Sequence, residues 1–223
     1  MREVGNGYGI ESNVLSSDEC DLLIWSIAKE SRSRGRAGVR NLMRNHSVRE
    51  LANDSRLVAI AKRFLGLSAI PYRATLFEKS GRANWLVVWH QDTVLPLERR
   101  IESDEWGPWS KKAGVLYAHA PAWAFNRVIA LRIHLDPSTE ANGPLRVIPG
   151  SHVFGILSEP DVIRIAHDQV SAKCLCPKGG ILAMRPLLIH ASSKVVDDKP
   201  RRVLHIEYTD SLELTEHIRI AVA

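Results

Sequence analysis

The chain has 223 residues, of which 45% are hydrophobic, so it is long enough to bury a core as a single domain over 1–223. The formal charge of +5 is a mild excess, and the basic residues are not interleaved with aromatic ones as in single-strand binders, which argues against nucleic acid as a partner. No apolar run reaches the about 18 uncharged residues of a membrane helix, and the first residues lack a signal-peptide core, so we expect a cytoplasmic protein without a membrane partner.

Residues 1–69 have the features of a mostly helical flank. Ser16 and Glu19 fit a capping box, in which each side chain accepts a hydrogen bond from the other residue's backbone, and apolar residues recur behind them at helical spacing. Ser47 begins a second capping box and a short helix, and Asp54 begins a third helix.

From about residue 70 to 210 the pattern changes to short β-rich runs separated by turn residues. The spacing of these runs favours a sandwich or barrel over repeated β-α-β units. The expected strands cover residues 71–79, 84–91, 115–119, 127–136, 145–149, 171–176, 180–185 and 202–209.

The segment 94–114 is longer than a hairpin loop and contains Trp106 and Trp109. Long loops inside compact domains often serve as lids over binding sites. We expect the two tryptophans either to close over a substrate or to anchor the segment by packing.

The three cysteines, Cys20, Cys174 and Cys176, are too few and odd in number for a disulfide scaffold. Cys174 and Cys176 are two residues apart in an expected strand and therefore share a face. A zinc site would need two more soft ligands at suitable spacing, so we predict packed thiols.

Two expected strands end in residues that can bind a metal ion. His90 and Asp92 follow an apolar run, and both can reach one metal ion because side chains two positions apart in a strand project to the same side. His190 ends another apolar run far along the chain, and a rolled-up β fold can bring it near the first two. Two imidazoles and one carboxylate form the facial triad of Fe(II) oxygenases, which leaves coordination sites open for a co-substrate and O2.

Arg201 follows the last of these residues at the start of the next expected strand. A guanidinium at this place can bind a carboxylate through two hydrogen bonds. If 2-oxoglutarate chelates the iron through its C1 carboxylate and C2 keto group, Arg201 can bind the distal carboxylate. Strand alternation alone does not separate Arg201 from Arg202.

Several short motifs surround these residues. They are Asn-Trp at 84–85, Trp-His-Gln-Asp at 89–92, Leu-Arg-Ile-His-Leu-Asp at 131–136, Asn-Gly-Pro-Leu at 142–145, Pro-Gly-Ser-His at 149–152, Arg-Pro-Leu-Leu-Ile-His-Ala-Ser at 185–192 and Arg-Arg-Val-Leu at 201–204. As a set they resemble the phytanoyl-CoA dioxygenase family of Fe(II)/2-oxoglutarate oxygenases, over most of the chain. The resemblance implies a double-stranded β-helix (a jelly-roll, cupin-like core) that uses Fe(II), 2-oxoglutarate and O2.

The resemblance also implies roles for individual residues. His90, Asp92 and His190 match the iron ligands of the family, and Arg201 matches its oxoglutarate-binding arginine. Positions that line the oxoglutarate pocket are matched more loosely by Thr75, Arg132 and Arg40. From their places in the expected strands, Asn84 and Ser192 can reach the same pocket, and His134 and His205 can face a substrate or instead be structural.

The expected reaction is hydroxylation of a small-molecule substrate, with release of succinate and CO2. Related halogenases lack the carboxylate ligand, so Asp92 favours oxygenation over halogenation. Arg40, Arg132 and the basic segment 32–40, with Arg32, Arg34 and Arg36, hint at an anionic substrate. Two alternatives stay open, namely a metal-dependent cupin-type enzyme that does not use 2-oxoglutarate and a non-catalytic binding module on the same fold.

Overall fold

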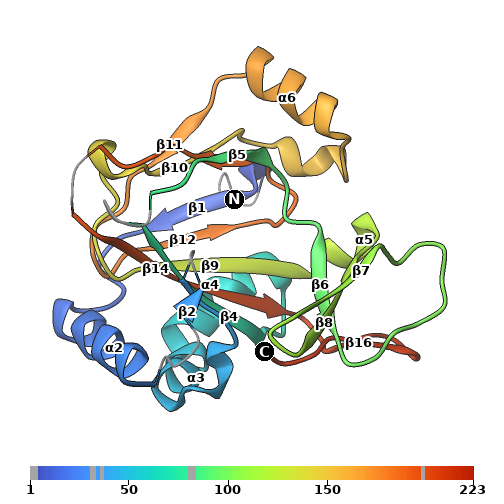
Figure 1. The fold of residues 1–223 in the computed structure, drawn as a ribbon, viewed down its shortest axis with the longest axis horizontal. Helices are drawn as coiled ribbons and strands as arrows, with labels where there is room; N and C mark the ends of the chain where they lie inside the picture. Colours follow the sequence, from blue (N-terminus) through green and yellow to red (C-terminus); the bar gives the residue numbers. More distant parts are fainter. Residues whose placement is uncertain (1–4, 31–33, 36–37, 80–83, 197–198) are drawn as a thin grey trace.

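The computed structural model describes residues 5–30, 34–35, 38–79, 84–196 and 199–223. Most of its strands form two facing antiparallel sheets, and helices pack against the outer face of the larger one (Figure 1). This is a jelly roll, which confirms the expected mainly β fold with N-terminal helices. Across the described ranges, no helix is both long and apolar enough to span a bilayer.

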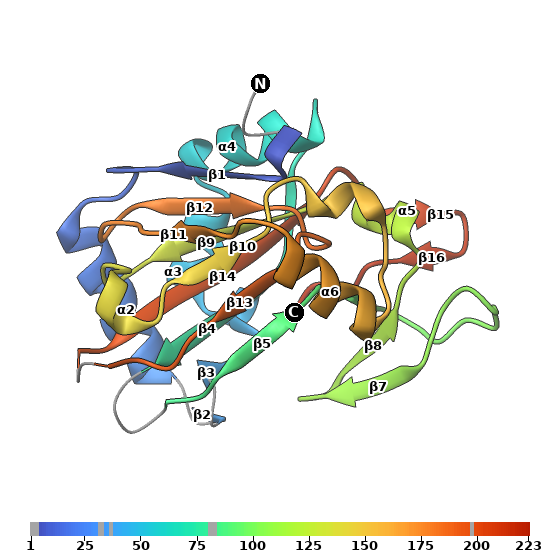
Figure 2. The same cartoon turned by 90° about the horizontal axis from the view of Figure 1, so that it is seen from above.

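The two sheets have antiparallel strand orders. In the larger sheet the order is β1 (Tyr8–Glu11), β12 (Ile181–Met184), β9 (Val128–His134), β14 (Arg201–Thr209), β4 (Ile70–Lys79), β3 (Gly38–Val39) and β2 (Arg34–Gly35). In the smaller sheet it is β11 (Ala172–Cys174), β10 (Leu145–Val147), β13 (His190–Ser192) and β5 (Val87–His90). Beside them lie β6 (Val94–Leu97), β8 (Val115–His119) and β7 (Trp109–Lys112), and the pair β15 (Glu213–Thr215) and β16 (Ile218–Arg219) (Figure 2).

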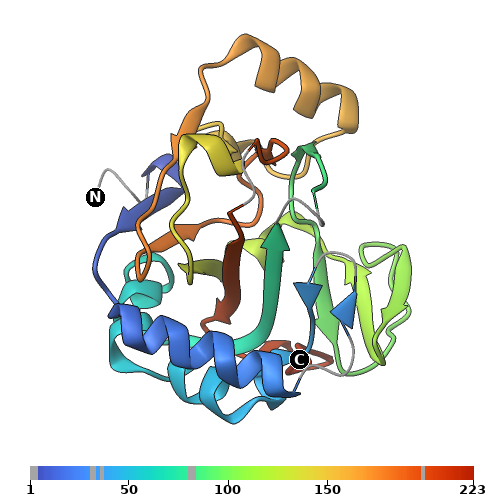
Figure 3. The ribbon, with the colours of Figure 1, turned by 60° about the vertical axis from the view of Figure 1, so that its left-hand side comes forward.

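The longer helices cover the outer faces of both sheets. Helices α2 (Ser17–Glu30), α3 (His46–Ala52) and α4 (Ser55–Leu65) pack under the larger sheet, and α6 (Glu159–Asp168) lies over the smaller one (Figure 3). The shorter turns are α5 (Ala122–Phe125), η1 (Leu42–Arg44), η2 (Glu140–Asn142) and η3 (Ser151–Phe154).

The helix starts follow from their capping residues. Before α2, the Ser16 backbone N–H donates to Glu19 at 2.7 Å and the Glu19 N–H donates to Ser16 Oγ at 3.2 Å, which confirms that capping box. Asp54 caps α4 as predicted. The start of α3 was placed wrongly at Ser47, because the Asn45 side chain accepts from the Val48 N–H and the helix begins at His46.

Strand alternation in β9 and β14 separates the apolar core from the interior between the sheets. Leu131 and Ile206 belong to the core that the larger sheet forms with the helices. Arg132 and His205, one position away from them, project to the other face, toward the smaller sheet. The polar residues of this face are therefore held by two strands whose other face is packed in the core.

Cys20, Cys174 and Cys176 are free and buried, and the prediction of packed thiols at Cys174 and Cys176 is confirmed.

The flank over 1–69 is mostly helical, as expected, but it also contains the short strands β1, β2 and β3. β1 and β3 pair with the distant strands β12 and β4, and β2 pairs with β3, so these two- to four-residue strands carry little local signal. One expectation about a connecting segment is wrong. The expected loop 94–114 contains β6 and β7, which pair on either side of β8. Pro96 in β6 lowers the strand signal, yet an edge strand tolerates proline.

Candidate active site

Three side chains from the smaller sheet converge at one point in the interior. In β5 and β13, His90 lies directly opposite His190, and Asp92 follows β5 with its N–H donating to Pro186 O at 3.0 Å. His90 Nε2 is 3.8 Å from Asp92 Oδ1, and His190 Nε2 is 3.7 Å from Asp92 Oδ2. One ligand atom from each residue lies within 4.8 Å of the others, which is a spacing that a single metal ion can bridge.

Both histidines are held in the same tautomer by their own strands. His90 Nδ1 is 2.8 Å from Val88 O, and His190 Nδ1 is 2.8 Å from Leu188 O. Because a carbonyl oxygen only accepts, each Nδ1 carries the hydrogen and each Nε2 offers its lone pair. The two rings are thus oriented as metal ligands.

The charge states of the three residues also suit a metal ion. Burial, the largest effect, lowers the pKa of His190, so its imidazole is neutral near pH 7. Burial would raise the pKa of Asp92, but the neighbouring histidines and Arg73 outweigh it and lower that pKa, so the carboxylate is ionised. A neutral imidazole and an ionised carboxylate are the forms that coordinate a metal cation.

The three residues open onto a cavity of about 140 Å³ between the two sheets. Its other lining residues are Arg73, Phe77, Lys79, Trp85, Val87, Arg132, Leu145, Ser192, Arg201, Val203 and His205. Four of the lining residues are lysine or arginine, and Asp92 is the one carboxylate among them, so the cavity attracts anions.

One end of the cavity is formed by two buried cations. Arg201 and Lys79 lie opposite each other in β14 and β4. Lys79 Nζ donates to Ser192 Oγ at 2.7 Å and to Ser193 O at 2.8 Å, and Arg201 donates to Asn142 O at 3.1 Å and to Ser192 Oγ at 3.3 Å. Neither cation has a carboxylate partner within the described ranges. Two buried cations without an anion form a site for a carboxylate.

Burial and nearby positive charges perturb both groups. The pKa of Lys79 falls to about 7, mainly through burial and then through the charges of Arg201 and Arg132. The pKa of Arg201 falls to about 10, mainly through burial and then through the charge of Arg132. Both shifts mark a place where an added negative charge would be stabilised.

Arg202 faces away from this end of the cavity. Its Nε and Nη2 donate to the two oxygens of Asp136 at 2.7 and 2.8 Å, and its own N–H also donates to that carboxylate at 2.9 Å. Arg201 is therefore the member of the pair that lines the cavity.

A chain of polar contacts runs along the wall formed by the larger sheet. Arg132 Nη1 is 3.2 Å from His205 Nδ1, His205 Nε2 is 3.2 Å from Glu207 Oε1, and Glu207 Oε2 is 2.9 Å from Arg73 Nε. Since a guanidinium only donates, His205 Nδ1 accepts and its Nε2 carries the hydrogen. The wall is thus a fixed sequence of cation, neutral imidazole, carboxylate and cation.

Sequence reasoning missed Arg73, Lys79 and Glu207. The expected strand 71–79 contained the signal for two of them, because Arg73 and Lys79 share strand parity with Thr75. Glu207 likewise shares parity with His205.

Six of the predicted site residues do not line the cavity, namely Thr75, Asn84, His134, Arg40 and the two tryptophans described below. Thr75 is buried opposite His205, and the Asn84 side chain both donates to and accepts from the Val195 backbone, at 2.9 and 2.8 Å, which ties two loops together. His134 is fully buried, which lowers its pKa to about 3, and Arg40 is exposed. Arg32 and Arg36 lie outside the described residues, as does the side chain of Arg34.

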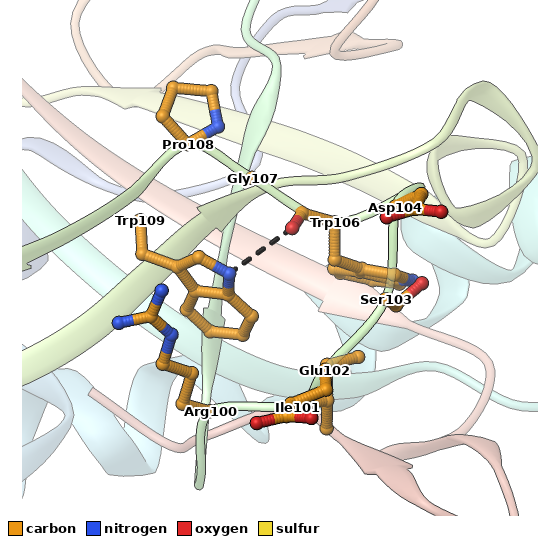
Figure 4. A pocket seen from close by; sticks show the side chains of 9 residues that line it. All are labelled: Arg100, Ile101, Glu102, Ser103, Asp104, Trp106, Gly107, Pro108 and Trp109. Carbon is orange, nitrogen blue, oxygen red and sulfur yellow. Dashed lines mark hydrogen bonds between the residues drawn. The ribbon is translucent and has the colours of Figure 1, made fainter.

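The two tryptophans of the expected lid lie at a separate surface cleft. Trp106 is buried against the Trp123 ring, with centroids 6.2 Å apart, and Trp109 Nε1 donates to Trp106 O at 3.1 Å. Both line a cleft of about 670 Å³ that residues 100–109 form (Figure 4). This geometry matches the anchoring alternative, since neither ring borders the cavity at His90.

Comparison with known proteins adds a family to this geometry. The family model for phytanoyl-CoA dioxygenase (PhyH) matches residues 6–203. An L-proline trans-4-hydroxylase of Streptomyces griseoviridis is 26% identical and aligns with 83% of this chain and 74% of its own.

Solved structures share the fold at low sequence identity. Apo EctD from S. alaskensis has a TM-score of 0.69 at 20% identity, covering 94% of this chain and 76% of its own. AviO1 from Streptomyces viridochromogenes Tue57 has a TM-score of 0.67 at 21% identity, covering 96% and 94%. The epimerase SnoN from nogalamycin biosynthesis, described as non-heme and alpha-ketoglutarate dependent, has a TM-score of 0.68 at 17% identity, covering 95% and 81%. The match of the family model over most of the chain shows that this protein belongs to the phytanoyl-CoA dioxygenase family of Fe(II)/2-oxoglutarate oxygenases.

Proposed function

We propose that the protein hydroxylates a small molecule in a reaction that uses Fe(II), 2-oxoglutarate and O2 and releases succinate and CO2. One observation carries this proposal. A facial set of His90, Asp92 and His190 opens onto the same cavity as two buried cations that lack a carboxylate partner in the described part of the chain.

The donor set fits Fe(II). Two imidazole nitrogens and one carboxylate are the ligands of non-haem Fe(II) oxygenases, and they leave coordination positions open. When bound, the iron supplies the oxidising chemistry together with O2. The residues of this chain hold the histidine ligands in orientation, through Val88 O and Leu188 O, and place the site between two sheets.

The cation pair fits the distal carboxylate of 2-oxoglutarate. Arg201 and Lys79 both donate to Ser192 Oγ, so this hydroxyl holds the two cations next to each other in the cavity wall. Ser192 Oγ in turn donates to Gly143 O at 2.8 Å, which fixes the hydroxyl. Arg132 also lines the cavity and adds a further positive charge for the co-substrate or the substrate.

Hydroxylation is favoured over halogenation because Asp92 supplies the carboxylate ligand whose absence makes room for a halide. The name of the related L-proline trans-4-hydroxylase supports the same outcome and a small-molecule substrate. The excess of cationic lining residues supports an anionic one.

The experiment is a succinate assay with omissions. Wild-type protein supplied with Fe(II), 2-oxoglutarate, O2 and a panel of small molecules should release succinate above its background rate for at least one compound. Omission of any one of Fe(II), 2-oxoglutarate or O2 should abolish the release. Turnover of a compound without 2-oxoglutarate would favour the cupin-type alternative. A protein that binds panel compounds without turnover under all conditions would be a binding module.

An absorption spectrum distinguishes binding of Fe(II) and 2-oxoglutarate from catalytic turnover. Under anaerobic conditions, Fe(II) and 2-oxoglutarate together should give a charge-transfer absorption band at about 500–530 nm, as expected for such a chelate. Asp92→Ala and His190→Ala should lose the band. A wild-type protein without the band would contradict the proposal.

A further inference from the structure

The end of the cavity that holds Arg73 has no assigned ligand. Arg73 and Lys79 lie on the same face of β4, six positions apart, which places their Cα atoms roughly 20 Å apart. Their paired residues in β14 are the same number of positions apart, since Arg201 lies opposite Lys79 and Glu207 lies opposite Arg73. The cavity thus has one cationic end at Lys79 and Arg201 and another at Arg73.

Arg73 is fixed in orientation but retains free donors. Its Nε forms an ion pair with Glu207 Oε2 at 2.9 Å, and its guanidinium carbon lies 5.7 Å from the centre of the Tyr117 ring. Glu207 uses its other oxygen for His205, so it is committed to positioning neighbours. In the described part of the chain, neither Nη atom of Arg73 donates a hydrogen bond to the protein, and these atoms belong to a residue that lines the cavity.

The charge balance of the cavity favours an anionic substrate. Fe(II) and 2-oxoglutarate carry equal and opposite formal charges, so loading both leaves the excess of positive lining residues unchanged. Glu207 offsets one of these charges from behind. A neutral substrate would leave the remaining positive charge of the cavity uncompensated, whereas an anionic substrate would reduce that charge.

The surroundings of Arg73 extend the positive potential outward. Lys112 Nζ lies 5.8 Å from the centre of the Tyr117 ring that also faces Arg73. Burial raises the pKa of Tyr117, and the nearby charges of Arg73 and Arg40 act against that rise. Arg40 and Lys112 therefore add positive charge near Tyr117, which Arg73 also faces.

We propose that Arg73 binds a carboxylate of the substrate, so that this oxygenase acts on a carboxylic acid. The inference rests on the proposed function and names its substrate class. Two free Nη donors side by side match the two oxygens of one carboxylate. Glu207, next to them, disfavours a dianion such as a phosphomonoester. Glu207 is a positioning residue, because its contact is with Arg73 and His205.

The test compares carboxylic acids with their own primary amides. The probes are free L-amino acids, including L-proline, 2-hydroxy acids and simple aliphatic acids, each paired with its amide. Binding is measured as a shift of the anaerobic Fe(II)–2-oxoglutarate band, and coupling as succinate release in air. For wild-type protein, we expect at least one acid to bind roughly 10-fold or more tightly than its amide and to stimulate succinate release.

Variants of Arg73 locate the preference. Arg73→Gln should weaken binding of that acid roughly 10- to 100-fold while leaving binding of its amide unchanged, and Arg73→Lys should recover part of the preference because it retains the charge. Arg164→Gln, the same change at an exposed residue of α6, should behave as wild type. The absorption band itself shows that each variant folds and binds Fe(II) and 2-oxoglutarate. If Arg73→Gln does not form the band, the wild-type comparison and the Arg73→Lys variant are sufficient for the test.

Two results would overturn the inference. The first is a wild-type protein that prefers no acid over its amide. The second is an Arg73→Gln protein that forms the band and keeps the wild-type ratio of acid to amide affinity. Absence of the band from the wild-type protein is a different failure, since it would overturn the proposed function and this inference with it.

Discussion

His90 and His190 face each other across two adjacent antiparallel strands, with ring centroids 4.2 Å apart and planes tilted by 51°. Each ring is anchored through Nδ1 to the carbonyl two residues before it. The site is thus built from the β-ladder itself, with Asp92 as the third ligand just beyond the end of β5. Rigid strands are a better support for a metal site than loops.

Arg201 and Arg202 form a matched pair for testing the 2-oxoglutarate site. Arg201→Gln should weaken 2-oxoglutarate binding roughly 10- to 100-fold, because it removes charge-assisted hydrogen bonds from a buried site. Arg202→Gln breaks the partly buried pair with Asp136, which lies outside the cavity, and should leave the affinity within about 2-fold of wild type. Titration of the anaerobic band measures both. Equal losses in the two variants would argue against the assignment.

Lys79 should make 2-oxoglutarate binding depend on pH. Burial and two nearby guanidiniums lower its pKa from 10.5 to about 7, so in the free protein it is charged below pH 7 and mostly neutral above. A bound carboxylate favours the charged form and raises this pKa. Binding of 2-oxoglutarate should therefore weaken as the pH rises through 7. Above pH 7, binding should be accompanied by uptake of a fraction of a proton. Calorimetry in two buffers of different ionisation enthalpy measures the uptake, which Lys79→Met should abolish. Uptake that survives in Lys79→Met would assign the proton to another group.

Gly143 should be needed for both the fold and the anion site. Its φ is +66°, and a Cβ there would lie 2.3 Å from Ser193 O, while its own carbonyl accepts from Ser192 Oγ. Gly143→Ala should destabilise the protein by about 1–3 kcal/mol and weaken 2-oxoglutarate binding. Gly150 has a φ of +78° with open space around it, so Gly150→Ala should show only the smaller cost of the backbone conformation, about 1 kcal/mol. Denaturant unfolding measures the loss of stability in each variant. Equal losses in Gly143→Ala and Gly150→Ala would contradict this explanation.

His205 should contribute to stability as a neutral bridge between charged neighbours. It accepts from Arg132 and donates to Glu207, and burial, the largest effect, lowers its pKa. His205→Phe leaves Arg132 and Glu207 without these partners in a buried site, and should cost about 2–4 kcal/mol. Unfolding of His217→Phe, at an exposed position, provides the comparison. A loss below about 1 kcal/mol for His205→Phe would show that water or the neighbours replace its hydrogen bonds.

The short spacing of strands and turns predicts a sandwich or barrel, and the family resemblance predicts the jelly roll. The spacing of His90 and Asp92 predicts that both reach one point, and their ligand atoms do lie together, although Asp92 lies just beyond β5. Strand parity with the predicted pocket residue Thr75 puts Arg73 and Lys79 on the interior face of β4. The sequence does not predict that these two residues line the cavity while Thr75 does not, because that depends on tertiary packing. Strand parity did not separate Arg201 from Arg202. The family resemblance favoured Arg201, and the structure shows why Arg202 is engaged elsewhere, with Asp136 in a different segment.

The most direct test of the account is an anaerobic titration of the wild-type protein with Fe(II) in the presence of 2-oxoglutarate, followed by the absorbance at about 500–530 nm. The account expects a band that saturates at one iron per chain, that His190→Ala abolishes and that excess chelator removes. A wild-type protein that binds no iron, or a band that persists in His190→Ala, would contradict the assignment of His90, Asp92 and His190 as the iron site.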